Sequence, residues 1–180
     1  EEIIRALQVD TWYVRLNTPK SWQKIRLDPY TIVDEWGVPW SKPPGSLYTS
    51  PVLPPLKNPT PEEIRRHPWP DPDEKSRFEG LREKTSRLFE ETDYALVADG
   101  LTGVGVFDMA WRLRGMEDVL MDMILHPEFT EALFQRLTDF YVAVYRNYMQ
   151  TVGDYIQMLI YYEDLSGQDG MTVSNNQRFS

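Results

Sequence analysis

The sequence has no cysteine and only two histidines, His67 and His126, among its 180 residues. Without cysteine the chain cannot form a disulfide, use a thiol in catalysis or bind a metal through thiolates. Two histidines also exclude a metal site with three histidine ligands. We therefore predict no metal site and no cofactor held within this chain. The absence of cysteine fits a reducing compartment, and we predict a cytoplasmic location.

Long hydrophobic runs and positive charge are also scarce. No stretch approaches the ~20 apolar residues of a membrane-spanning helix, so we expect no membrane partner. The 28 acidic and 19 basic side chains give a formal net charge of −9. Because a nucleic-acid surface needs an excess of lysine and arginine, we predict no nucleic-acid partner. The chain begins with Glu1 and has no signal-peptide pattern, so we expect that residue 1 is not the native start.

Proline is abundant, and its distribution bears on domain organisation. Most of the 14 prolines lie between residues 39 and 72. We predict one domain over residues 1–180, since this length suffices for a single core. Residues 38–59 are predicted to be an irregular proline-rich excursion. Aromatic and aliphatic side chains interrupt this excursion, which argues against a low-complexity linker.

The order of the predicted elements is typical of an α/β protein. Residues 94–98 (YALVA) and 155–162 (YIQMLIYY) are continuous apolar runs, as expected for buried parallel strands. Helix patterns and capping residues predict a helix from about residue 60 and further helices over residues 71–91, 106–113, 116–125 and 126–150. From residue 71 onward, helices and strands alternate as in a parallel sheet. Shorter strands are predicted over residues 11–16 and 30–33.

Carboxylates follow three of these strands. Asp34 follows the strand of residues 30–33, Asp99 follows residues 94–98, and Glu163 and Asp164 follow residues 155–162. Ligands of α/β sheets lie beyond the carboxyl ends of the strands, where a carboxylate can bind a cationic group or accept a proton. Each carboxylate could instead cap the next turn. We expect at least one of them to be functional.

Two other motifs have ordinary structural explanations. Residues 100–105 have the glycine spacing G-x-x-G-x-G, which is not the dinucleotide-binding pattern, and they include no P-loop lysine. This segment could hold an anion at the following helix, but a tight turn is favoured. His67 lies in the basic stretch RRHPWP. It could belong to a small cationic site, and we favour a solvated helix end.

Four stretches together have the order and spacing of a known family. They are residues 6–10 (ALQVD) with 33–40 (VDEWGVPW), residues 67–73 (HPWPDPD), residues 103–115 closing in LRG and followed by Asp118 and Asp122, and Gly153 and Asp154 with residues 163–170 (EDLSGQDG) and Ser174. On these motifs the chain resembles the uroporphyrinogen decarboxylase superfamily, which comprises decarboxylases and corrinoid-linked methyltransferases. The likeness spans most of the chain.

The resemblance implies a (β/α)8 TIM barrel whose mouth accepts a tetrapyrrole, a corrinoid or a corrinoid protein. Barrels of the family are roughly twice as long as this chain. We therefore expect a partial barrel that lacks the first and last strand regions. A partial barrel leaves strand edges uncovered, so a homo-oligomer is an expected way to cover them.

The resemblance also implies site residues. We predict Asp164 as the catalytic residue and Trp111, Asp99, Glu163 and Gln168 as substrate-binding residues. Trp111 falls where the decarboxylases have a pocket tyrosine. The Glu163–Asp164 pair with Gln168 is more similar to the methyltransferases, so the resemblance favours corrinoid-linked methyl transfer.

Two alternatives stay open. One is a true uroporphyrinogen decarboxylase, a carboxy-lyase of tetrapyrrole biosynthesis that needs no cofactor. The other is a non-catalytic fragment that binds a tetrapyrrole or corrinoid. In the decarboxylases the central aspartate matches a position upstream of residue 1. Methyltransferase members bind zinc through cysteines and a histidine that would lie beyond residue 180, so zinc would belong to the full-length protein.

Overall fold

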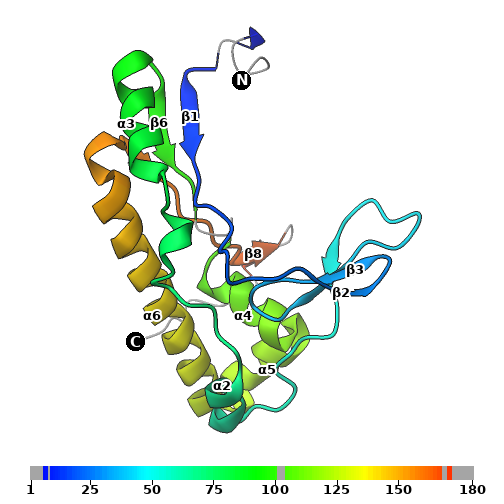
Figure 1. Ribbon diagram of the computed structural model, residues 1–180. Coiled ribbons are helices and arrows are strands. Elements are labelled where there is room, and N and C mark those ends of the chain that lie inside the picture. The colour runs from blue at the N-terminus through cyan, green and yellow to red at the C-terminus, as the bar shows by residue number, and fades with distance from the viewer. Residues whose placement is uncertain (1–5, 8, 101–103, 168–169, 172–180) are drawn as a thin grey trace.

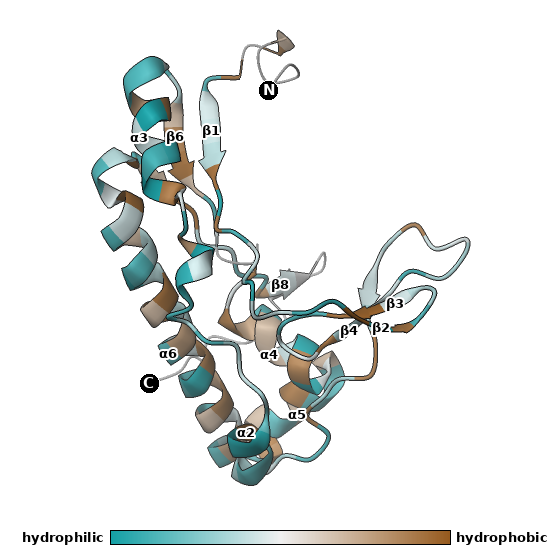
Figure 2. Ribbon diagram, in the orientation of Figure 1, coloured by the Kyte–Doolittle hydropathy of each residue, from teal (hydrophilic) through white to brown (hydrophobic). Residues whose placement is uncertain are grey.

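The computed structural model describes residues 6–7, 9–100, 104–167 and 170–171. Its longest element is helix α6 (Pro127–Val152), which runs beside a small parallel sheet, whereas a second sheet projects away from this helix (Figure 1). Hydrophobic and hydrophilic residues alternate in bands along α6 (Figure 2), as expected for a helix that buries one side. Among the helices in the described ranges, none is long and apolar enough to cross a membrane.

The parallel sheet has the strand order β1 (Thr11–Val14), β6 (Ala95–Ala98) and β7 (Met158–Leu159). All four residues of β1 pair with β6, but only Val97 and Ala98 pair with β7. The strand prediction is thus confirmed for β1 and β6. It is largely wrong for residues 155–162, where Gly153–Tyr155 forms a 3-10 turn and only two residues join the sheet.

Two helices cover one face of this sheet. Val14, Leu96 and Ala98 form a buried cluster with side chains of α3 (Leu81–Glu91) and the last turns of α6. The hydroxyl of Tyr148 on α6 donates a hydrogen bond to the carbonyl oxygen of Val14. Tyr13, whose neighbours along β1 point to the opposite face, is 44% exposed. The helices therefore fix the sheet from one side.

The second sheet is antiparallel, with the order β2 (Ile25–Asp28), β3 (Thr31–Val33), β4 (Pro39–Ser41) and β5 (Ser50–Pro51). Residues 34–38 connect β3 and β4, and this turn enters the helical core. Asp34 Oδ1 accepts the backbone N–H groups of Trp36 and Val38, both at 2.9 Å. Trp36 and Val38 are buried, and the Trp36 ring centroid lies 4.6 Å from that of Phe140 on α6.

The helical core consists of α2 (Pro61–Arg66), α4 (Val106–Arg114), α5 (Met116–Leu125) and the first half of α6. These four predicted helices are confirmed, and Thr60 caps α2 by accepting the N–H of Glu63. The helix predicted over residues 71–91 is wrong at its start. Lys75–Arg77 is a 3-10 turn, and Gly80 precedes α3 at a φ of 69°, a left-handed conformation that favours glycine and interrupts the helix.

The predicted partial (β/α)8 barrel is wrong. The parallel sheet is open, with β1 and β7 as its two edges, and four further strands form a separate antiparallel sheet. A third, two-stranded pair joins β8 (Ser166–Gly167) to β9 (Gly170–Met171). Strands β2 to β5 are connected to one another by short segments, which produce antiparallel neighbours and cannot extend a parallel sheet. The chain is a small α/β protein with separate sheets.

Arg114, at the end of α4, places a charge inside the helical core. Its Nε donates to Asp122 Oδ2 at 2.7 Å, and its Nη1 donates to the carbonyl oxygen of Lys57 at 2.8 Å. Asp118 Oδ2 lies 3.3 Å from Nη1. The Arg114 and Asp122 side chains are 8% and 4% exposed, whereas that of Asp118 is 59% exposed. Arg114 thus ties the segment before α2 to α4 and α5.

We expect the two carboxylates around Arg114 to contribute very unequally to stability. Asp122→Asn leaves a buried guanidinium without its charged partner and should lower the free energy of unfolding by about 3–5 kcal/mol. Asp118→Asn is the matched control, and its exposed pair should contribute less than about 1 kcal/mol. Urea denaturation measures both. Equal losses in the two variants would contradict the inferred role of the buried pair.

His67 is the C-cap residue of α2, so the predicted helix end is confirmed, but the ring is half-buried and the expectation of a solvated side chain is wrong. Its ring centroid lies 4.8 Å from that of Trp69, and its Nε2 lies 2.9 Å from the carbonyl oxygen of Trp36. In the neutral tautomer that carries the proton on Nε2, the ring donates this hydrogen bond. Burial lowers the pKa of His67, while the bond to Trp36 and the charge of Asp34 oppose that shift.

This lowered pKa predicts a pH dependence of folding. The unfolded chain binds the proton near the ordinary histidine pKa of about 6.5, whereas the folded chain binds it only at lower pH. The stability due to neutral His67 is therefore complete above that value and is lost as the pH falls through the folded pKa. We expect the His67 ring resonance to titrate below about 6.5. His126→Gln leaves one histidine and assigns the signal, and a midpoint at or above the ordinary value would refute the inference.

Candidate functional site at the carboxyl edge of the parallel sheet

Asp99 directly follows β6 at the carboxyl edge of the parallel sheet. Its Oδ2 accepts a hydrogen bond from Arg15 Nε at 2.6 Å, and its Oδ1 accepts one from the Tyr162 hydroxyl at 3.0 Å. The Asp99 side chain is 14% exposed, whereas that of Arg15 is 72% exposed. The hydrogen bond to Asp99 is the main reason that the pKa of Tyr162 is raised. Asp99 is therefore a fixed carboxylate that joins the ends of all three strands.

Glu163 binds the first turn of α4. Its Oε1 accepts the backbone N–H of Asp108 at 3.1 Å, and its Oε2 accepts the Tyr161 hydroxyl at 2.8 Å. The Tyr161 oxygen in turn accepts the N–H of Val106 at 3.1 Å. The first N–H groups of a helix have no partner within it and carry a partial positive charge, so a carboxylate is stabilised there. Burial, followed by the neighbouring Glu163, raises the pKa of Tyr161 to about 12.

Gly105 permits this close approach. A Cβ atom at this position would lie 2.3 Å from Glu163 Oε2 and 2.4 Å from the backbone oxygen of Tyr162. A side chain on residue 105 would thus displace the segment that carries the acidic pair. The glycine spacing in the sequence indicated a tight turn. At residue 105, glycine is required because the segment of Tyr162 and Glu163 packs too closely to leave room for a side chain.

Asp164 and Trp111 complete the described part of the candidate site. Asp164 is exposed and forms no hydrogen bond or ion pair with another residue of the described ranges. Trp111 is half-buried, and its Nε1 donates to Asp108 Oδ1 at 2.9 Å. Asp164 is consequently a carboxylate available to a ligand, whereas the orientation of the Trp111 indole is fixed by Asp108.

The structure brings the predicted site residues together to different degrees. Glu163 and Trp111 both bind Asp108, one through its backbone N–H and the other through its carboxylate. Asp99 and Glu163 are connected through adjacent tyrosines. Gln168 lies outside the described residues. For Asp34 the alternative interpretation holds, because this carboxylate is occupied by the turn of residues 34–38.

Sequence reasoning missed the hydroxyl partners of the carboxylates. Tyr161 and Tyr162 were assigned to a buried strand, although their position directly before the acidic pair placed them at the sheet edge. Asp108 and Trp111 are three residues apart on a helix, a spacing at which side chains meet. Arg15 had no signal beyond its place at the end of β1.

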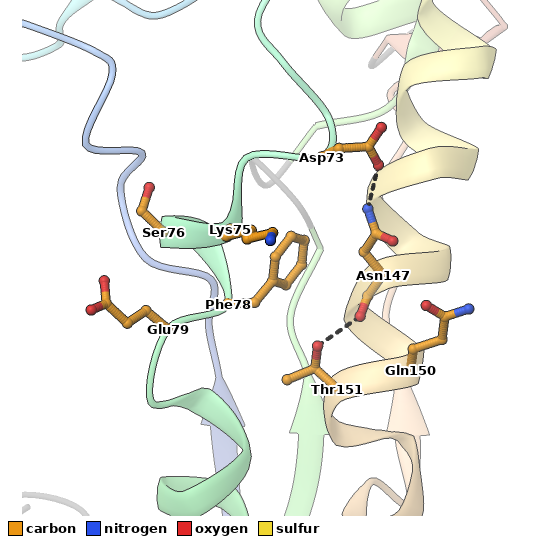
Figure 3. A pocket seen from close by; sticks show the side chains of 8 residues that line it. All are labelled: Asp73, Lys75, Ser76, Phe78, Glu79, Asn147, Gln150 and Thr151. Atoms are coloured by element: carbon orange, nitrogen blue, oxygen red, sulfur yellow. Dashed lines mark hydrogen bonds between the residues drawn. The ribbon is translucent and has the colours of Figure 1, made fainter.

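A cavity lies elsewhere, between the 3-10 turn Lys75–Arg77 and α6. It has a volume of about 780 Å³ and includes none of the predicted site residues. Figure 3 shows Asn147 of α6 pointing towards Asp73, to which its amide donates at 2.8 Å. The other side chains in the figure come from the two sides of a wide opening, namely Lys75, Ser76, Phe78, Glu79, Gln150 and Thr151. Asp99, Glu163 and Asp164 do not line this cavity, so it is separate from the candidate site.

Comparisons with protein-family models, curated proteins and solved structures found no match to this chain. The resemblance to the uroporphyrinogen decarboxylase superfamily therefore stays a prediction. Within the described ranges, no group of three histidine, aspartate or glutamate side chains could hold a metal ion. The residues present do not fit the zinc site of the methyltransferases, which requires cysteine.

We expect Gly105→Ala to disrupt the contact between Glu163 and α4. The added methyl group overlaps the backbone oxygen of Tyr162, so the variant should lose roughly 1–3 kcal/mol of stability. The backbone N–H resonance of Asp108 should also shift, because its acceptor is displaced. Urea denaturation and amide NMR spectra measure the two effects.

Gly153→Ala is the control for this substitution. A Cβ atom there meets only Met149 Cβ, at 3.8 Å, which is an ordinary contact. Its φ of −57° also suits alanine. The control should leave the Asp108 resonance in place and change stability by less than about 1 kcal/mol. If Gly105→Ala behaves like this control, the close packing at Gly105 is not what positions Glu163.

Proposed function

We propose that the chain provides the ligand site of an enzyme that acts on a corrinoid or tetrapyrrole partner, with methyl transfer as the favoured reaction. The observation that carries the proposal is the set of carboxylates at one edge of the parallel sheet. Asp99 and Glu163 are held by tyrosine hydroxyls, and exposed Asp164 follows Glu163 directly. A cytoplasmic location belongs to the same proposal and is supported by the absence of cysteine.

The two types of carboxylate suit different tasks. Because Asp99 and Glu163 already accept hydrogen bonds, they shape and orient the site. Asp164 is available to accept a hydrogen bond from the N–H of a corrin amide or a pyrrole ring, or to exchange a proton with a bound ligand. A positioned general acid or base contributes typically 10²–10⁴-fold to a rate. Asp164 is therefore the residue to which we assign the catalytic role.

Trp111 distinguishes the two reactions. Protonation of a pyrrole carbon is favoured by a carboxylate that faces the pyrrole N–H groups and by additional hydrogen-bond donors around the ring. The Trp111 N–H is already bound to Asp108, so it offers no free donor to such a ring. This supports methyl transfer over decarboxylation. Zinc is not part of the proposed chemistry of these residues, because the chain has no cysteine to bind it.

The test is a pair of absorbance titrations of the 180-residue chain with hydroxocobalamin and uroporphyrin. We expect saturable binding of hydroxocobalamin. Asp164→Asn should weaken it by tenfold or more, because a hydrogen bond to a charged group contributes about 1.5–3 kcal/mol. Asp93→Asn is the matched control. Asp93 is also exposed, but it precedes β6 and lies at the amino ends of the strands, away from the candidate site.

Each outcome bears on a separate part of the proposal. Binding of uroporphyrin alone, with the same loss in Asp164→Asn, would favour decarboxylation over methyl transfer. Equal affinities of Asp164→Asn and the wild-type chain would remove Asp164 from the site. If neither probe binds to the folded wild-type chain, the proposal of a corrinoid or tetrapyrrole ligand fails.

A further inference from the structure

Arg112, in the second turn of α4, lies between two tryptophans. Its guanidinium carbon is 5.0 Å from the ring centroid of Trp40 and 5.5 Å from that of Trp111. Both distances are within the range in which a cation is attracted to the face of an aromatic ring. Trp40 comes from the antiparallel sheet, whereas Trp111 precedes Arg112 on α4. The two indoles therefore restrict the guanidinium from two different elements.

Carboxylates fix the positions of both indoles. Trp40 Nε1 donates to Asp34 Oδ2 at 2.7 Å, and Trp111 Nε1 donates to Asp108 Oδ1 at 2.9 Å. The indole N–H groups are thus occupied, and the rings cannot turn without breaking these bonds. The aromatic surroundings of Arg112 are held in place before any ligand arrives, which reduces the entropy lost on binding.

Arg112 has no hydrogen-bond or ion-pair partner among the described residues. Its Nε is buried and unbonded. The two buried arginines differ in this respect, since Arg77 makes a two-nitrogen ion pair with Glu35 and Arg114 binds Asp122. An unsatisfied buried donor costs about 1–3 kcal/mol, so a half-buried guanidinium without an acceptor is costly to keep. Its outer nitrogens, Nη1 and Nη2, are left to bind an acceptor from outside the chain.

The charges around Arg112 restrict the kind of acceptor. Asp34, Asp108 and Asp164 all favour the charged guanidinium, although no carboxylate oxygen of the described residues lies within 4.0 Å of it. Burial lowers the pKa of Arg112, and these three carboxylates counteract the shift. A dianion such as phosphate would be repelled by three negative charges. A singly charged carboxylate meets less repulsion and still matches two parallel N–H donors.

We propose that Arg112, held between Trp40 and Trp111, binds the carboxylate group of a small-molecule ligand through its Nη nitrogens. The inference does not rest on the reaction proposed above. It requires only that the ligand carry a carboxylate and present it beside the two indoles. Trp111 and Asp164 border both sites, so one ligand that spans them is compatible with this arrangement.

The test uses benzoate as the carboxylate probe and benzamide as its neutral analogue of the same shape. Binding is followed through the Nε–H resonance of Arg112, which is assigned from its loss in Arg112→Lys. We expect a saturable shift with benzoate and at least tenfold weaker binding of benzamide. Inorganic phosphate should also bind more weakly than benzoate. Tryptophan fluorescence supplies the affinities of variants that lack this resonance.

Two substitutions of Arg112 separate the contribution of its positive charge from that of its paired N–H donors. Arg112→Gln should weaken benzoate binding at least tenfold. Arg112→Lys retains the charge but not the paired donors, and it should weaken binding at least fivefold. Arg136→Gln is the matched control, because Arg136 is also half-buried and lies 5.2 Å from a single indole, that of Trp69. The control should bind benzoate as the wild-type chain does.

Other results would overturn the proposal. No shift of the Arg112 resonance at benzoate concentrations up to about 50 mM, which excludes even millimolar affinity, would show that the guanidinium only supports the two indoles. Equal binding of benzamide would indicate an apolar pocket without carboxylate recognition. Phosphate binding as tight as that of benzoate would refute the choice of a singly charged ligand. Unchanged affinity in folded Arg112→Lys would remove the requirement for paired donors.

Discussion

The arrangement of the molecule depends on the hydrogen bonds of the Asp34 carboxylate. One of its oxygens closes the turn of residues 34–38, so that Trp36 enters the core beneath α6. Its other oxygen holds Trp40, which faces Arg112 on α4. A single side chain therefore joins the antiparallel sheet to the helices and also shapes the surroundings of an unpaired cation. Because the two sheets share no strand pairing, this turn attaches the antiparallel sheet to α6, the helix that also packs on the parallel sheet.

Helix α4 uses charged residues in three different ways along its length. In its first turn the N–H of Asp108 binds Glu163, its second turn presents Arg112 between two indoles, and its last residue, Arg114, is buried in an ion pair. The nine-residue helix is thus fixed at both ends by electrostatic interactions that are complete. Among the described residues of α4, Arg112 is the charged side chain without a hydrogen-bond or ion-pair partner. A rigid helix of this kind suits the presentation of a binding group better than a loop does.

The sequence was most informative where local pattern and burial agree. The continuous apolar run before Asp99 predicted β6, and the capping residues and apolar spacing predicted α2 and α6. The strand-end rule located Asp99 and Glu163 at one edge. The prediction of a strand over residues 155–162 was largely wrong, because apolar content does not specify pairing and only Met158 and Leu159 form residue pairs with β6. The contact of Arg112 with Trp40 joins residues 72 positions apart, and no local pattern encodes it.

The short pairing of β7 has a consequence for the motions of the sheet edge. This strand is attached to β6 through two residue pairs, flanked by backbone bonds from Gln157 to Leu96 and from Ile160 to Ala98. Met158 and Leu159 are 58% and 43% exposed, so little burial reinforces the ladder. Regions with few buried contacts open locally at a free energy well below that of global unfolding. We therefore expect β7 to open from β6 at a lower free energy than the helices around Trp36, so that the hydrogen bonds of Tyr162 to Asp99 and of Glu163 to α4 are what keep the acidic segment in place.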